Sequence, residues 1–139
     1  MPTINEIIDF IYLALDEKYT PEQDIFRSKY CISGDDCSEF LEAYAMKYNV
    51  DMKDFLWYFH YEEEGLNIGS IFFKTPDARV EHIPITPIML ETFANKGKWD
   101  MTYPEHTLPK YRIDLMINSG CHFVLLLLAI LILTKKYCN

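Results

Sequence analysis

Residues 120–139 read GCHFVLLLLAILILTKKYCN, and this stretch decides the architecture because its apolar centre carries no charged side chain. Counting back through LMINS extends the uncharged segment to residues 115–134, a length of 20 residues. A helix rises about 1.5 Å per residue, so this segment would span roughly 30 Å, the thickness of the hydrocarbon core of a bilayer. A core helix of a soluble protein should show a polar face, and FVLLLLAILIL shows none.

We therefore predict one transmembrane helix at residues 113–135, followed by a short basic tail at residues 136–139. The alternative is a helix buried within the fold or within an oligomer. Polar residues at 118–122 would reach the membrane interface, or would hydrogen-bond between helices and support self-association. The side chains predicted to contact lipid are spread along the segment: Leu115, Phe123, Leu125, Leu128, Ile130 and Leu133.

Charge is divided unevenly along the chain. The whole chain has a formal net charge of −8, and residues 1–108 carry 20 acidic against 9 basic side chains. Residues 109–139 carry a net charge of +3. An acidic head repels phosphate backbones, so we expect no nucleic-acid binding and favour a basic protein as the unidentified partner.

The sequence also predicts a location. The four cysteines, at positions 31, 37, 121 and 138, show neither a disulfide framework nor zinc-ligand spacing, which favours a reducing compartment. Residues 3–18 form an acidic amphipathic pattern and not a signal peptide. Basic residues flank both ends of the apolar segment, so the positive-inside rule gives no preference. Five C-terminal residues are easier to translocate than an acidic head, so we predict a single-pass protein of the bacterial inner membrane with its head in the cytoplasm.

Two segments of the head have clear helix boundaries. Residues 3–15, TINEIIDFIYLAL, place Thr3 and Glu6 at capping-box spacing and apolar residues at helical intervals. In ITPIMLETFANKGKW, residues 85–99, Thr86 is the predicted cap, Pro87 the first helical residue and Gly97 the stop. Both segments predict α-helices.

The rest of the head is less regular. Residues 35–50, DDCSEFLEAYAMKYNV, predict a second helix with an acidic start, where the helix dipole favours negative charge. Residues 50–65 predict a further helix, capped by Asp51 and rich in aromatic side chains. Residues 66–85 predict an irregular excursion with room for a short strand pair. The head therefore covers residues 1–103, and residues 104–112, which include two prolines, form a linker.

Part of this sequence resembles known proteins. GDDCSEFLEAYAMKYNVDM, residues 34–52, resembles the second helix of acyl carrier proteins. The order of GDD, an acidic helix, YNVDM, an aromatic cluster and ITPIMLETFANKGKW is similar to a family of small enterobacterial proteins, the domain-of-unknown-function family fourteen-ninety-three. That family is sometimes described as acyl-carrier-like, and the likeness covers about residues 3–100.

The resemblance implies a small acyl-carrier-like helical bundle, but it implies no function. A carrier protein attaches phosphopantetheine to a serine at the start of this helix, and the matching position here falls within residues 34–36. Ser33 precedes a glycine and Ser38 falls inside the predicted helix. We therefore expect no phosphopantetheine arm and no other cofactor.

The candidate binding residues lie on the second helix and in the aromatic cluster. Carrier proteins dock partners on the matching acidic surface, and clustered charges give specificity and fast association. The alternative is a solvated, capped helix start. Large aromatic side chains are frequent binding anchors. The residues predicted to bind a partner are Asp35, Asp36, Glu39, Glu42, Trp57 and Tyr58.

No segment has a catalytic signature, since the sequence lacks a Gly-rich phosphate loop, a nucleophile elbow and an HExxH pattern. Adjacent carboxylates at Asp35 and Asp36 are weak evidence for a cation, so we expect no metal site. The sequence thus predicts a non-enzymatic, membrane-tethered protein-binding module. An immunity or antitoxin protein that neutralises a basic toxin is one version. The alternatives are an atypical or degenerate acyl carrier, or a structural membrane protein that self-associates through its apolar segment.

Overall fold

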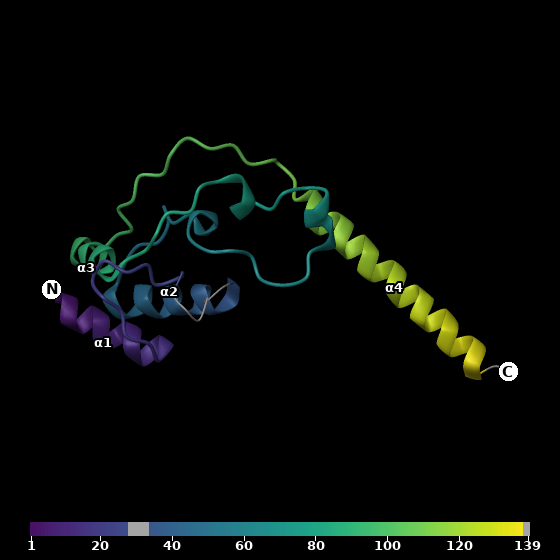
Figure 1. Cartoon of the computed structure of the whole chain (residues 1–139), viewed down its shortest axis with the longest axis horizontal. Coiled ribbons are helices and arrows are strands. Elements are labelled where there is room, and N and C mark those ends of the chain that lie inside the picture. Colours follow the sequence, from purple (N-terminus) through teal and green to yellow (C-terminus); the bar gives the residue numbers. More distant parts are fainter. Residues whose placement is uncertain (28–33, 138–139) are drawn as a thin grey trace.

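The computed structural model describes residues 1–27 and 34–137, and the fold of these residues is mostly helical, with no sheet. Three α-helices gather in the head: α1 (Ile4–Leu15), α2 (Gly34–Tyr48) and α3 (Pro87–Lys96). The last helix, α4 (Ile113–Tyr137), projects away from them (Figure 1). The prediction of a mostly helical protein with one apolar C-terminal helix is confirmed.

The ends of α1 and α3 follow from their capping residues. The Thr3 side chain accepts from the backbone N–H of Glu6, and the Glu6 carboxylate accepts from the Thr3 N–H at 2.8 Å, so the capping box forms. In α3 the Thr86 side chain caps the helix and Gly97 ends it with φ +70°, a left-handed conformation that glycine adopts without strain. Both predicted helices are confirmed.

The core lies where the three head helices meet. The ring of Phe10 from α1 lies 5.5 Å from that of Phe40 on α2, and Phe93 on α3 lies 4.5 Å from Trp99, between ring centroids. Trp99 is only 1% exposed. Rings at these distances add to the stability gained from burying their area. One aromatic core therefore joins all three helices.

A buried hydrogen bond also ties α2 to α3. The Tyr44 hydroxyl donates to the carbonyl oxygen of Leu90 at 2.6 Å, and burial raises the pKa of Tyr44, so it stays protonated. We expect Tyr44→Phe to lower the unfolding free energy by about 1 kcal/mol, because the ring packing remains while one buried hydrogen bond is lost. Denaturant unfolding in mild detergent measures this loss. Tyr48→Phe is the control, since its longer 3.3 Å bond to the Glu6 carbonyl is exposed; an equal loss in both variants would contradict the prediction.

The predicted helix at residues 50–65 is wrong. Asp51 forms a parallel bridge with Lys98: its N–H donates to the Gly97 carbonyl at 3.0 Å, and its carbonyl accepts from the Trp99 N–H at 2.8 Å. Asp51 is extended, as helix caps also are, but the residues that follow it form a turn and not an α-helix. The only helical part is the 3₁₀ turn η1 (Trp57–Phe59).

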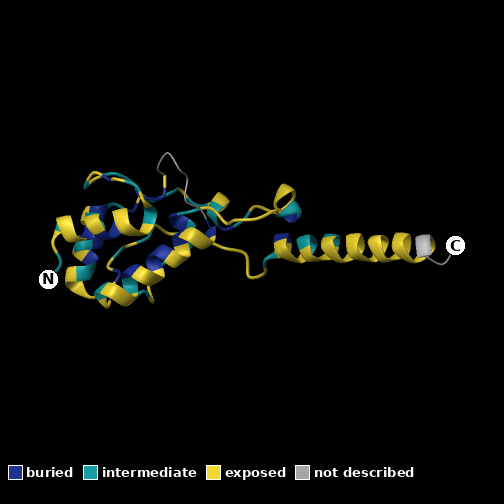
Figure 2. Ribbon diagram, turned by 90° about the horizontal axis from the view of Figure 1, so that it is seen from below, coloured by how far each residue is buried: buried dark blue, intermediate teal, exposed yellow. Residues whose placement is uncertain are grey.

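Residues 60–86 form an irregular excursion, which contains the range 66–85 that the sequence predicts to be irregular. It contains two 3₁₀ turns, η2 (Ile68–Ile71) and η3 (Asp77–Arg79), and no paired strands. Its tip reaches out to the first turns of α4, and the burial view shows the same neighbourhood from another side (Figure 2). The excursion therefore connects the head to the apolar helix at a second place, apart from the covalent link at residues 100–112.

This second connection, which we call the head–tail joint, combines residues 63–69 with residues 112–118. Arg112 donates to both carboxylate oxygens of Glu63, at 3.1 and 2.5 Å, and pairs with Asp114 at 2.6 Å. Its bonds to Asp114 and then to Glu63 raise the pKa of the Arg112 guanidinium above its usual value. Asn67 donates to the Asp114 carboxylate at 2.9 Å, and that carboxylate belongs to a residue only 3% exposed.

Backbone groups complete the joint. The Asn118 side chain accepts from the Ile68 N–H at 3.2 Å and donates to the Leu66 carbonyl at 3.1 Å. Gly69 lies so close to α4 that a Cβ atom there would meet the carbonyl oxygen of Asp114 at 1.9 Å. Only glycine permits this approach. The polar residues at the start of α4 thus bind the excursion.

Beyond the joint, α4 has no cover. The stretch Ile113–Lys135 is 23 residues long, its most apolar window has a mean hydropathy of 2.3, and no residue of that window is buried. By length and composition this helix can cross a membrane. All the residues predicted to contact lipid are exposed on it: Leu115, Phe123, Leu125, Leu128, Ile130 and Leu133.

Candidate functional site

A groove runs along the exposed side of α2. Residues 35, 38, 39, 42 and 45 recur at helical spacing, so their side chains share one face. Residues 52–61 pass beside that face and close the groove, whose cavity volume is about 380 Å³. We call this the α2 groove, and it is lined by Asp35, Ser38, Glu39, Leu41, Glu42, Ala45, Met52, Phe55 and Tyr61.

The α2 groove has an acidic rim and an apolar floor. Asp35, Glu39 and Glu42 are exposed, so their carboxylates stay hydrated. Phe55 and Tyr61 are half-buried and present ring surface. An apolar floor with charges around its edge is the arrangement found in protein interfaces, where the centre supplies binding energy and the rim supplies specificity.

One hydroxyl pair closes the end of the groove near the start of α2. The oxygen atoms of Ser38 and Tyr61 lie 3.0 Å apart, and Ser38 also donates to the Gly34 carbonyl at 3.3 Å. Burial raises the pKa of Tyr61, although the bond to Ser38 opposes this, so the phenol stays protonated. Ser38 therefore lies within α2, bonded to neighbours; Ser33, the other serine considered for a carrier arm, lies outside the described residues.

The structure brings together only part of the predicted binding set. Asp35, Glu39 and Glu42 line the groove, whereas Asp36 faces a neighbouring hollow beside α1 that is lined also by Ala14 and Leu15. Trp57 and Tyr58 lie outside the α2 groove. The Trp57 ring contacts that of Tyr61 at 5.8 Å between centroids, so it supports the groove from behind. A binding role for Asp36, Trp57 and Tyr58 stays a prediction.

The groove residues that sequence reasoning did not select are Ser38, Leu41, Ala45, Met52, Phe55 and Tyr61. The last three belong to the segment expected to form a helix, and a helical register would have placed them elsewhere. Helical spacing could have identified two of them. Ser38 and Ala45 lie three or four positions from the acidic residues of α2, so they share a helix face with them. No pattern in a single sequence marks which residues of an irregular segment pack beside that face.

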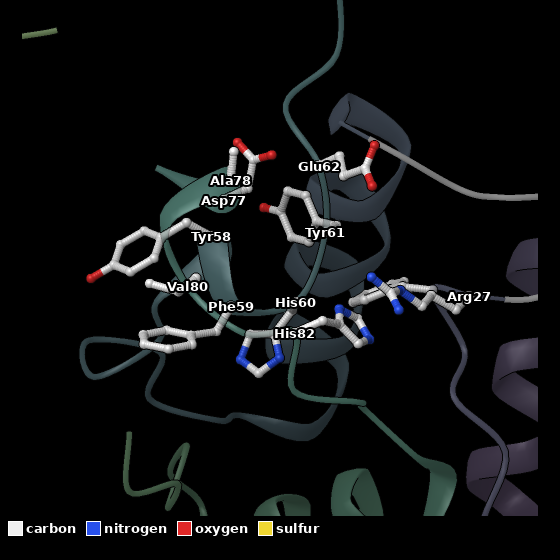
Figure 3. A pocket seen from close by; sticks show the side chains of 11 residues that line it. Arg27, Tyr58, Phe59, His60, Tyr61, Glu62, Asp77, Ala78, Val80 and His82 are labelled. Carbon is white, nitrogen blue, oxygen red and sulfur yellow. The ribbon is translucent and has the colours of Figure 1, made fainter. Parts of the chain in front are cut away.

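A second cavity, of about 390 Å³, is lined largely by the excursion, together with residues 26–27 and 58–59 (Figure 3). His82 contacts Asp24 at 2.6 Å, and His60 lies nearby with its ring fully buried. Figure 3 shows Tyr58 and Arg27 on opposite sides of the cavity. Among the described residues that line this cavity there is no serine, threonine or cysteine that the His–Asp pair could activate.

The buried histidine is held in one defined state. His60 Nδ1 lies 2.8 Å from the Ile83 carbonyl, which can only accept, so Nδ1 carries the proton. Nε2 then accepts from the Tyr103 hydroxyl at 2.8 Å, and that hydroxyl accepts from Trp99 Nε1 at 2.9 Å. Burial lowers the pKa of His60 to about 4, while the bond to Ile83 opposes this. His60 is therefore a neutral residue of the core.

The described residues contain no group of three or more His, Cys, Asp or Glu side chains that could hold a metal ion. Of the two cavities, the α2 groove suits a macromolecular ligand better, because it is open, partly apolar and surrounded by acidic side chains.

Comparison with known proteins supplies a family. No curated protein and no solved structure matches the chain. Residues 4–102 match the family described as Protein of unknown function (DUF1493), which confirms the family resemblance that the sequence motifs predict. The matched range contains α1, α2, α3 and the whole excursion, and it ends before α4. Since the match covers more than half of the chain, this protein belongs to the DUF1493 family.

Proposed function

We propose that this chain is a membrane-anchored, non-enzymatic binding module that receives a basic segment of a protein partner in the α2 groove. The observation that carries the proposal is the acidic rim of Asp35, Glu39 and Glu42 around an apolar floor. A segment with lysine or arginine beside apolar side chains would satisfy both parts of the groove. Opposite charges would also speed association, which then weakens as salt rises.

The second part of the proposal is the anchor. In α4 the uncovered apolar surface has no partner in the described head, and a bilayer is the solvent that suits it. We place the protein in the bacterial inner membrane, with the head in the cytoplasm. Anchoring holds the head near a partner in the same membrane and so raises the effective concentration of the binding site.

The experiment that tests the groove compares two charge-matched double variants of the full-length protein. Glu39→Lys/Glu42→Lys reverses the rim, whereas Asp9→Lys/Glu22→Lys reverses two exposed carboxylates outside the groove that have no predicted binding role. Each protein is captured from detergent-solubilised membranes of the native cell, and companions are identified by mass spectrometry. We expect the native protein and the control to retain a partner that the rim variant binds roughly tenfold more weakly or worse.

Equal loss in both double variants would assign the effect to overall charge and contradict a specific groove. The anchor is tested in the same cells. We expect the native protein in the membrane fraction after a carbonate wash, and a periplasmic reporter enzyme fused after residue 139 to be active. Recovery of the native protein from the soluble fraction would contradict the anchor, and an inactive reporter on membrane-bound protein would reverse the orientation.

A further inference from the structure

The tip of the excursion exposes large apolar side chains to an unusual degree. Leu66 is 76% exposed, Ile71 77%, Phe72 72% and Phe73 39%. Single exposed apolar residues are common on protein surfaces, but a group of this size within eight residues indicates a contact surface. We call Leu66 and the Ile71, Phe72 and Phe73 side chains the apolar tip.

The head–tail joint fixes the place of the apolar tip. Asn118 bonds to the backbone of Leu66 and Ile68, and Gly69 contacts the Asp114 carbonyl, so the tip is held at the first turns of α4. Figures 1 and 2 both show η2 beside the start of α4. The position of the apolar tip is therefore set by α4 as well as by the rest of the head.

The length of α4 determines how deep the joint lies. Residues 119–134 lie beyond the joint, and at about 1.5 Å per residue they span roughly 24 Å. A hydrocarbon core is about 30 Å thick, so these residues fall short of crossing it by themselves. Leu115 and Met116, which are 38% and 68% exposed, must supply the missing length. The joint is thus drawn to the boundary of the bilayer.

Electrostatic attraction to lipid does not hold the apolar tip at the membrane surface. Glu62, Glu63 and Glu64 begin the excursion, and Lys74 follows the apolar tip, so the region has no excess of positive charge that would bind anionic lipid. The attraction must come from apolar area transferred out of water. A bilayer of uncharged lipid is therefore sufficient to bind the apolar tip.

We propose that the apolar tip inserts into the interfacial layer of the same bilayer that α4 crosses, as a second membrane contact of the head. This inference rests on the proposed membrane anchor. Two contacts on one bilayer, α4 and the tip, fix the tilt of the head relative to the membrane, whereas a single helix followed by a loose linker would let the head turn freely.

The test uses tryptophan fluorescence of the full-length protein in vesicles of phosphatidylcholine. Phe72→Trp reports on the tip, Leu128→Trp on the middle of α4, and Leu13→Trp on α1, where Leu13 is 80% exposed far from the joint. Trp57 and Trp99 add the same background to every variant, and the native chain measures it. Quenching is compared between lipids that carry a nitroxide either near the headgroup or deep in the acyl chain, and iodide in the water.

We expect the Phe72→Trp emission to shift to shorter wavelength and to be quenched several-fold more by the shallow nitroxide lipid than that of Leu13→Trp, with iodide showing the opposite order. If Leu128→Trp is quenched by nitroxide lipid but Phe72→Trp behaves like Leu13→Trp, the second contact is refuted while the anchor stands. If iodide quenches Leu128→Trp and nitroxide lipid does not, the membrane anchor is refuted. The second membrane contact is then refuted as well, because it depends on the anchor.

Discussion

Replacing Gly69 by alanine is expected to open the head–tail joint while leaving the head folded. The added Cβ would lie 1.9 Å from the Asp114 carbonyl oxygen and 2.6 Å from its carbonyl carbon. Both atoms belong to the backbone of α4 and cannot rotate aside, so η2 and α4 must separate. The separation breaks the bonds that Asn67 and Ile68 make to α4 and leaves the Asp114 carboxylate short of a partner.

The expected cost is about 3 kcal/mol of local opening free energy, from forced overpacking and lost buried hydrogen bonds. Amides in η2 and the first turns of α4 should then exchange with deuterium roughly a hundredfold faster. Hydrogen exchange with mass spectrometry in detergent micelles measures this. The control is Gly120→Ala, because Gly120 is on the same helix and has nothing within 4 Å of an added Cβ. Unchanged protection in Gly69→Ala would show that the joint does not depend on this close approach.

The second large effect concerns acid. The pKa of His60 is about 4 in the folded state, and an unfolded histidine titrates near 6.5. Between these values the unfolded chain binds the proton and the folded chain does not, so stability falls as pH falls. The full contribution is present above about pH 6.5, and roughly 3 kcal/mol is lost by pH 4. The main physical reason is burial, because a charged imidazolium at this position would be held out of water. A proton on Nε2 would also face the Tyr103 hydroxyl, which already accepts from Trp99.

Denaturant unfolding at a series of pH values, followed by the fluorescence of Trp99, measures this dependence in mild detergent. We expect His60→Gln to be less stable than the native chain at pH 7 but to lose much less stability between pH 6.5 and 4. His106→Gln is the matched control, because His106 is exposed and bonds Tyr58 on the surface, and it should keep the native pH dependence. Equal pH dependence in the His60→Gln and native chains would contradict the assignment.

The elements that sequence reasoning located correctly are those whose boundaries depend on local chemistry. Thr3, Glu6, Thr86 and Gly97 act on backbone groups within a few residues of themselves, so their effect can be predicted from spacing alone. The apolar length of α4 is likewise a property of one segment. These features needed no knowledge of distant partners.

The segment at residues 50–65 shows why the rest was not predictable. Its conformation depends on residues about 45 positions away, through the bridge of Asp51 to Lys98 and the bond from the Leu56 N–H to the Tyr103 hydroxyl at 3.2 Å.

The same cause limited how much of the α2 groove and the head–tail joint could be predicted from the sequence. The acidic rim on α2 could be predicted from spacing, but the floor formed by Met52, Phe55 and Tyr61 could not, since it depends on that irregular segment. Asn118 could be assigned only a general interfacial role from the sequence. Its actual partners are backbone groups at Leu66 and Ile68, which no pattern of side chains reveals.

The first residues of α2 are bonded to the base of the excursion: the Gly34 N–H donates to the Glu62 carbonyl at 3.2 Å, and the Asp35 N–H donates to the Glu64 carboxylate at 3.4 Å. Glu63, between them, binds Arg112. A mechanical load applied at the groove can thus pass through three neighbouring residues into the start of α4, without stretching residues 100–112. The start of α2 and the start of α4 are thus joined by hydrogen bonds through Glu62, Glu63 and Glu64, in addition to the covalent chain.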